Sequence, residues 1–70
     1  MINVWDYQEI KRIRIVDIDG QVFFGEVIEV TDAEDDSPDY GFGEDSITIE
    51  SEGHQIAFPK SEILSIDILD

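Results

Sequence analysis

The sequence predicts an all-β domain with a short N-terminal helix, in which five strands form a small and strongly bent barrel. Apolar and polar residues alternate in several short runs, as they do in strands with one buried face. The pairs Asp19-Gly20 and Glu52-Gly53 separate such runs and are typical of tight hairpin turns. Gly25 lies inside the longest run, where a residue without Cβ permits a sharp bend or a close backbone approach.

The length of 70 residues predicts a single domain, 1–70, with a thin core. A chain of this size buries only about 60% of the surface that its unfolded form exposes, so self-association would add to its stability. Cysteine is absent, which excludes disulfides and thiolate metal sites. We find no apolar run that would span a membrane and no secretory signal, and we therefore expect a cytoplasmic location.

The charge is strongly negative, with 18 Asp and Glu against 4 Lys and Arg and a net charge of −14. Such a surface repels nucleic acid and anionic membranes, because affinity for phosphates comes mainly from Lys and Arg. The same charge would also keep a small domain soluble.

Residues 3–10 are predicted to form the short helix. Asn3 is a suitable N-cap, and the Asp6 carboxylate lies near the positive helix end. Val4 and Tyr7 share a face that must dock on the remaining chain, because so short a helix is unstable alone. An N-terminal strand is the alternative.

The first strand is predicted over Lys11–Asp19. Ile13 and Ile15 point to one face and Val16 and Ile18 to the other, a change of parity that indicates a bulge or burial on both faces.

The second strand is predicted over Gly20–Asp32, with its bend at Gly25. Its apolar residues alternate between two faces: Val22, Phe24, Ile28 and Val30 against Phe23 and Val27.

A long acidic connection, residues 32–46, follows the second strand and contains no basic residue. The later strands are expected at Ile47–Ser51, at 55–58 and at Ile63–Leu69. Pro59 ends the fourth strand, because proline has no N–H to donate to a ladder.

Two groups of residues in this pattern resemble the motifs of the Sm-like family, also called LSm, which includes the bacterial Hfq proteins and shares the SH3-like barrel shape. The first group comprises Gly20, Gly25 and Asp32 with Val22, Val27 and Val30 between them; the second comprises Phe58, Ile63 and Ile66. The resemblance covers most of the chain. It implies a helix on a five-stranded bent barrel and assembly of subunits into a ring.

The RNA-contact positions implied by the resemblance carry different residues. The family's base-contacting Asn corresponds to Asp35, with Glu34 before it, and its Arg-Gly pair corresponds to Pro59 and Lys60. Asp offers no amide donor and repels phosphate, and Pro supplies no guanidinium group. Nucleic acid is therefore not expected to bind at the family's usual site.

Ring assembly is the leading functional hypothesis. The resemblance implies that the fourth strand of one subunit pairs with the fifth strand of its neighbour, and exposed strand edges favour such pairing. The expected interface residues come from these two strands: Gln55, Ile56, Phe58, Ile63, Leu64, Ile66 and Ile68. In the alternative, the apolar side chains of the fifth strand are all internal.

The few basic residues suggest a second hypothesis, an RNA-binding protein with a non-standard patch. Its candidate phosphate contacts are Lys11, Arg12, Arg14 and Lys60. We favour the alternative that the basic cluster at 11–14 pairs within the chain with Asp17, Asp19 or Glu29.

The acidic connection suggests a third hypothesis, a cation-responsive protein adaptor. Asp32, Glu34 and Asp36 alternate like the first ligands of a calcium loop. The sequence has no Gly after Asp36 and has Gly43 where such a loop needs its final Glu, so at most a weak surface cation is expected. Tyr40 and Phe42 are candidate anchors for a protein partner.

Catalysis has no support in the sequence. Cysteine is absent, His54 follows a turn glycine, and no spaced Ser/His/Asp set is present. We expect no cofactor. The sequence thus predicts a non-catalytic, oligomerising binding or scaffold module.

Overall fold

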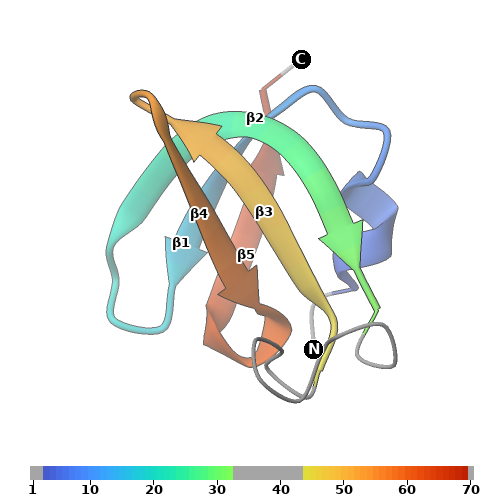
Figure 1. Cartoon of the computed structure of the whole chain (residues 1–70). Coiled ribbons are helices and arrows are strands. Elements are labelled where there is room, and N and C mark those ends of the chain that lie inside the picture. Colours follow the sequence, from blue (N-terminus) through green and yellow to red (C-terminus); the bar gives the residue numbers. More distant parts are fainter. Residues whose placement is uncertain (1–2, 33–43, 70) are drawn as a thin grey trace.

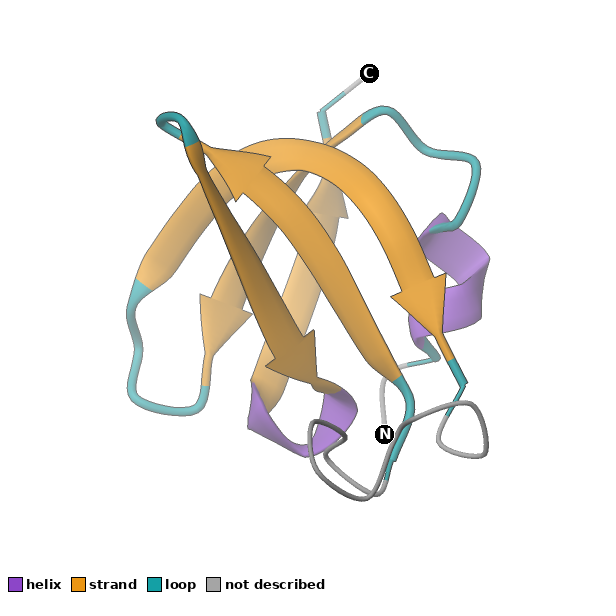
Figure 2. Cartoon of the chain, in the orientation of Figure 1, coloured by secondary structure: helices purple, strands orange, loops and turns teal. Residues whose placement is uncertain are grey.

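The computed structural model describes residues 3–32 and 44–69 and contains one sheet of five antiparallel strands in the order β4-β3-β2-β1-β5 (Figure 1). The elements are η1 (Val4–Tyr7), β1 (Arg12–Asp17), β2 (Val22–Thr31), β3 (Ser46–Ser51), β4 (His54–Pro59), η3 (Lys60–Glu62) and β5 (Ile63–Ile68). Helix is confined to two single turns, and strands dominate the described chain (Figure 2). The predicted β class and the five strands are confirmed.

The N-terminal helix forms, but it is shorter than predicted and is a single 3-10 turn. Asn3 is confirmed as the N-cap, because its side-chain oxygen accepts from the Trp5 backbone N–H at 3.2 Å. Val4 is fully buried and joins the helix to the core. The indole N–H of Trp5 donates to the Asp45 carboxylate at 3.1 Å, which joins the helix to the chain just before β3.

The long strand β2 arches over the sheet and is shared between two partners (Figure 1). Its first half pairs with β1 and its second half with β3, and Gly25 lies next to the point of exchange. A Cβ built on Gly25 would lie 2.4 Å from the backbone oxygen of Glu50. The predicted need for glycine at this bend is confirmed.

Two extra residues shift the register of the sheet. In β2, Ile28 is unpaired between Val27 and Glu29, so that Val30 lies opposite Ile47 on the core side. The predicted grouping of Val30 with Val22, Phe24 and Ile28 is therefore wrong, because alternation alone does not reveal a bulge. In β5, Leu64 is the extra residue opposite the step between Val16 and Asp17 of β1.

The parity change predicted in the first strand has neither of its two predicted causes. β1 pairs with β2 without a register shift, and the bulge opposite Val16 and Asp17 has its extra residue in β5. Ile18 lies beyond the end of β1 and is 59% exposed, so burial on both faces does not account for the change. The backbone N–H of Ile18 donates to the carbonyl of Glu62 in η3 at 3.0 Å, so hydrogen bonding between the two chain segments continues past the bulge.

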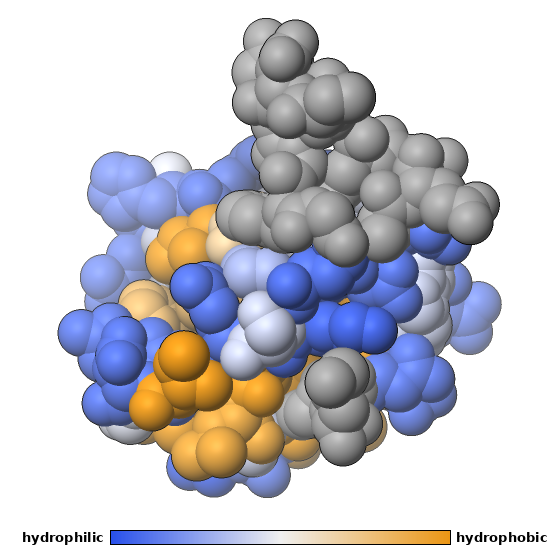
Figure 3. Space-filling model, turned by 90° about the horizontal axis from the view of Figure 1, so that it is seen from below, coloured by the Kyte–Doolittle hydropathy of each residue, from blue (hydrophilic) through white to orange (hydrophobic). Residues whose placement is uncertain are grey.

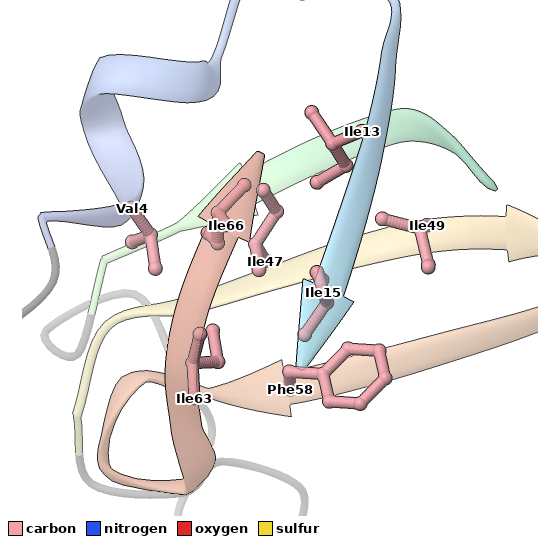
Figure 4. Packing of buried hydrophobic residues seen from close by; sticks show 8 residues of the cluster. All are labelled: Val4, Ile13, Ile15, Ile47, Ile49, Phe58, Ile63 and Ile66. Atoms are coloured by element: carbon pink, nitrogen blue, oxygen red, sulfur yellow. The ribbon is translucent and has the colours of Figure 1, made fainter. Parts of the chain in front are cut away.

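The core lies on the concave side of the sheet and comprises eight buried residues (Figure 4): Val4, Ile13, Ile15, Ile47, Ile49, Phe58, Ile63 and Ile66. The Phe23 and Phe58 rings pack at its margin, with centroids 5.1 Å apart and planes inclined by 60°. Isoleucine side chains from β1, β3 and β5, with Val4 of η1 and Phe58 of β4, thus fill the thin core that the length predicted.

The bent sheet does not close into the predicted barrel, and β4 and β5 form its two edges. They are joined by η3, a 3-10 turn that the sequence did not predict. The Glu44 carboxylate accepts from the Ser61 backbone N–H at 2.6 Å and from the Ser61 hydroxyl at 3.0 Å. The Lys60 N–H donates to the Asp45 carbonyl at 2.9 Å. These contacts hold the turn against the start of β3.

Candidate functional site

The open edge of β4 presents alternate backbone groups to the outside. Glu52 and Gly53 both have positive φ, as in a two-residue hairpin turn, so Ser51 and His54 exchange the hydrogen bonds that close it. Bonded and non-bonded residue pairs alternate along β3 and β4 from this turn, and the bond from the Lys60 N–H to the Asp45 carbonyl fits that alternation.

It follows that Gln55 and Ala57 direct their backbone N–H and C=O groups away from β3. Pro59 lies at the third position of this outward series, where its missing N–H interrupts no bond to β3.

The open edge of β5 follows the same rule. The Leu69 N–H donates to the Arg12 carbonyl at 3.0 Å. Every second residue of β5, counted back from Leu69, therefore forms its backbone hydrogen bonds with β1. The intervening residues, Ile66 and Ile68, direct their backbone groups away from β1. Each edge therefore offers two uncharged residues, spaced two apart, for pairing.

The residues predicted at the interface separate into three groups. Phe58, Ile63 and Ile66 have their side chains in the core of the chain itself. Ile56 is half-buried beside the core. The exposed members are Gln55, Leu64 and Ile68. The alternative in which every apolar side chain of the fifth strand is internal is therefore wrong.

Exposed large apolar side chains are numerous for so small a chain: Ile18, Val22, Phe24, Ile28, Leu64, Ile68 and Leu69. In the view from below, apolar surface shows in more than one place among hydrophilic residues, with the larger area in the lower part of the view (Figure 3). Large exposed apolar patches are typical of interaction sites.

The basic residues predicted to form a patch are divided between two places. Lys11, Arg12 and Arg14 lie on or beside β1, and both Lys11 and Arg12 are exposed. Lys60 lies in η3, near the opposite end of β1, as the bond between Ile18 N–H and the Glu62 carbonyl shows.

Arg14 is engaged within the chain, as predicted, but with a different partner. Its Nε donates to the Asp67 carboxylate at 2.9 Å, and a second guanidinium nitrogen donates to the same oxygen. The predicted partner Asp17 instead accepts from the Asp19 and Gln21 backbone N–H groups of the turn, at 2.9 Å each.

The acidic connection lies largely outside the described residues, and with it the candidates Glu34, Asp36, Tyr40 and Phe42. Asp32 is half-buried directly after β2. Within residues 3–32 and 44–69, no group of three or more His, Cys, Asp or Glu side chains is arranged to hold a metal ion.

The outer face of the sheet carries two adjoining depressions that the sequence did not predict, with volumes of about 410 and 290 Å³. Both are lined by Phe24 of β2 and by Glu52 of the β3–β4 turn. The larger one also includes the exposed residues Arg12, Glu26 and Leu69. The alternation in the sequence placed Phe24 on the opposite face from Phe23, but the departure of β3 from β2, which opens the depression, had no local signal.

Comparisons with family models, with curated proteins and with solved structures find no match to this chain. In the part of the chain that the structure describes, no helix is sufficiently long and apolar to cross a lipid bilayer.

Proposed function

We propose that this protein is a non-catalytic, Sm-like scaffold whose subunits assemble when β4 of one chain pairs with β5 of the next. The observation that carries the proposal is the strand order, which leaves β4 and β5 as the two edges of an open sheet. Unpaired strand edges are templates for adding a strand from another chain.

The two edges are complementary in backbone spacing. Gln55 and Ala57 on one edge, and Ile66 and Ile68 on the other, each provide two outward-facing backbone sites two residues apart. Natural edges are commonly protected by charged side chains, but none of these four residues is charged.

Pairing between two different edges has a consequence for the form of the assembly. Each added subunit uses one edge and leaves its other edge open, so growth continues until the rotation between subunits closes a ring. A closed ring is the form that the Sm-like resemblance also implies.

Apolar side chains next to these edges supply a hydrophobic contribution. Ile68 is 51% exposed although it lies opposite the fully buried Ile13, and Ile56 on the other edge is only half-buried. Pairing of the edges would cover both side chains. Repulsion between chains of charge −14 opposes assembly, but salt screens it over about 8–10 Å.

The test is the mass of the assembly, measured by sedimentation velocity over a concentration series at moderate salt. Ala57→Pro removes one outward N–H without breaking a bond to β3, and we expect it to shift the protein to monomer. Ala57→Ser, which keeps the N–H, is the matched control and should assemble like the wild type.

A second pair of variants tests the apolar edge. Ile68→Lys should weaken assembly, whereas Ile28→Lys makes the same charge change at an exposed residue of a central strand and should not. A wild-type protein that stays monomeric at high micromolar concentration would refute the proposal, as would unchanged assembly of Ala57→Pro.

A further inference from the structure

A groove lies where β2 separates from β3. It is formed by the two depressions that share Phe24. β3 pairs with β2 only from Glu26 onward, and the pair Glu26–Glu50 is the last one before the two strands separate. Residues 22–25 of β2 therefore have β1 on one side and the β3–β4 turn on the other.

Backbone groups of β2 point into this groove. The Val27 N–H donates to the Lys11 carbonyl at 3.0 Å, so Val27 and alternate residues before it bond to β1. Val22 and Phe24 consequently direct their N–H and C=O groups toward the side on which β3 has already ended. A partner chain lying extended in the groove would face these groups.

The apolar part of the groove comes from two exposed side chains. Phe24 is 56% exposed and Leu69 is 46% exposed, and both line the larger depression. An apolar side chain inserted between them would remove surface from water on three side chains together.

The polar part of the groove is acidic. Glu26 and Glu50 lie directly opposite each other on adjacent strands, an arrangement of like charges that destabilises a sheet. Glu52 adds a third carboxylate to the lining. Among the described residues that line the groove, Arg12, which lies opposite Glu26 on β1, is the single basic one. A cation bound beside Glu26 and Glu50 would reduce their repulsion.

We propose that this groove binds an extended basic segment of another protein. An apolar side chain of the partner packs between Phe24 and Leu69, and its Lys or Arg side chains pair with Glu26, Glu50 and Glu52.

Charge complementarity selects this occupant. A second copy of the chain would bring 18 acidic against 4 basic residues, and nucleic acid or anionic lipid would bring phosphates against the three carboxylates.

The groove is separate from the outward backbone groups proposed for assembly, which belong to Gln55, Ala57, Ile66 and Ile68. A failure of partner binding and a failure of assembly can therefore be told apart, because groove variants should leave the sedimenting mass unchanged.

The experiment uses a short labelled peptide in which lysine alternates with leucine, with fluorescence anisotropy for affinity and amide NMR shifts for location. We expect binding at low salt with shifts confined to the groove. Peptides in which serine replaces leucine, or glutamate replaces lysine, should bind more weakly.

Matched variants separate the groove from the general negative charge. Glu50→Gln should weaken binding about 2- to 5-fold, whereas Glu29→Gln removes an exposed carboxylate of the same sheet outside the groove and should change it less than about 2-fold.

Phe24→Ser should weaken binding about tenfold, whereas Ile28→Ser, at an exposed residue of the same strand outside the groove, should change it little.

Three results would overturn the proposal: no binding at low salt, equal effects of the groove variants and their controls, or shifts scattered over the acidic surface. Shifts of the groove amides on self-dilution, or with single-stranded RNA or anionic vesicles in place of the peptide, would assign it to a different occupant and also overturn it.

Discussion

Replacing Gly25 by Ala is the sharpest test of how the sheet bends. The added methyl group would lie 2.4 Å from the Glu50 oxygen, 3.0 Å from the Glu50 carbonyl carbon and 3.1 Å from Ile49 Cδ1. The first two atoms are backbone and cannot rotate away, so β2 and β3 must separate just where Glu26 pairs with Glu50.

The cost follows from these contacts. Overpacking against a rigid neighbour costs about 3 kcal/mol, and the smaller entropy of the unfolded Ala variant offsets about 0.4–1 kcal/mol of it. We therefore expect the free energy of unfolding to fall by about 2 kcal/mol, a large part of the roughly 4–10 kcal/mol expected for a chain of this size.

Urea unfolding followed by circular dichroism measures the change. With a slope of about 1 kcal/mol per molar urea, the midpoint should fall by about 2 M. Gly53→Ala is the control. Its φ is +84°, and within residues 3–32 and 44–69 no atom other than those of its chain neighbours lies within 4 Å of the added Cβ, so it should cost only about 1 kcal/mol of left-handed strain. A Gly25→Ala midpoint equal to that of the wild type, or no lower than that of Gly53→Ala, would refute the close-approach argument.

Two further substitutions test contacts that join distant parts of the chain. Trp5→Phe removes the N–H that donates to Asp45 and should lower the free energy of unfolding by about 1 kcal/mol; circular dichroism is the suitable probe because Trp5 is the only tryptophan. A loss below about 0.3 kcal/mol would contradict a contribution from this bond. Asp67→Asn should change stability by less than about 0.5 kcal/mol, because the Arg14 and Asp67 side chains are 43% and 48% exposed. A loss above about 1.5 kcal/mol in urea unfolding would mean that the ion pair is more important than its exposure indicates.

The elements of the fold could be predicted because their signals are local. Strand alternation, the turn pairs ending in Gly20 and Gly53, and the Asn3 cap each depend on a few adjacent residues. Gly20 and Gly53 have φ of +85° and +84°, which few other residues adopt at low cost. The bend at Gly25 was also predictable, since a glycine inside a long apolar strand usually marks a bend or a close backbone approach.

Pairing between distant residues could not be predicted in the same way. Arg14 meets Asp67 only because β5 lies beside β1, and the sequence offered nearer carboxylates at Asp17, Asp19 and Glu29. The unpaired residues Ile28 and Leu64 reverse the side-chain parity of their strands, and nothing in their immediate neighbours indicates this.

The sequence by itself determined the β class, the positions of the turns and the glycine at the bend, because backbone preferences and hydrophobic periodicity act over a few residues. Only the tertiary structure decided which strands remain as open edges, which apolar residues stay exposed, and where β2 leaves β3 to form the groove around Phe24. Those features depend on register and on the lengths of paired strands, which are fixed when distant segments meet.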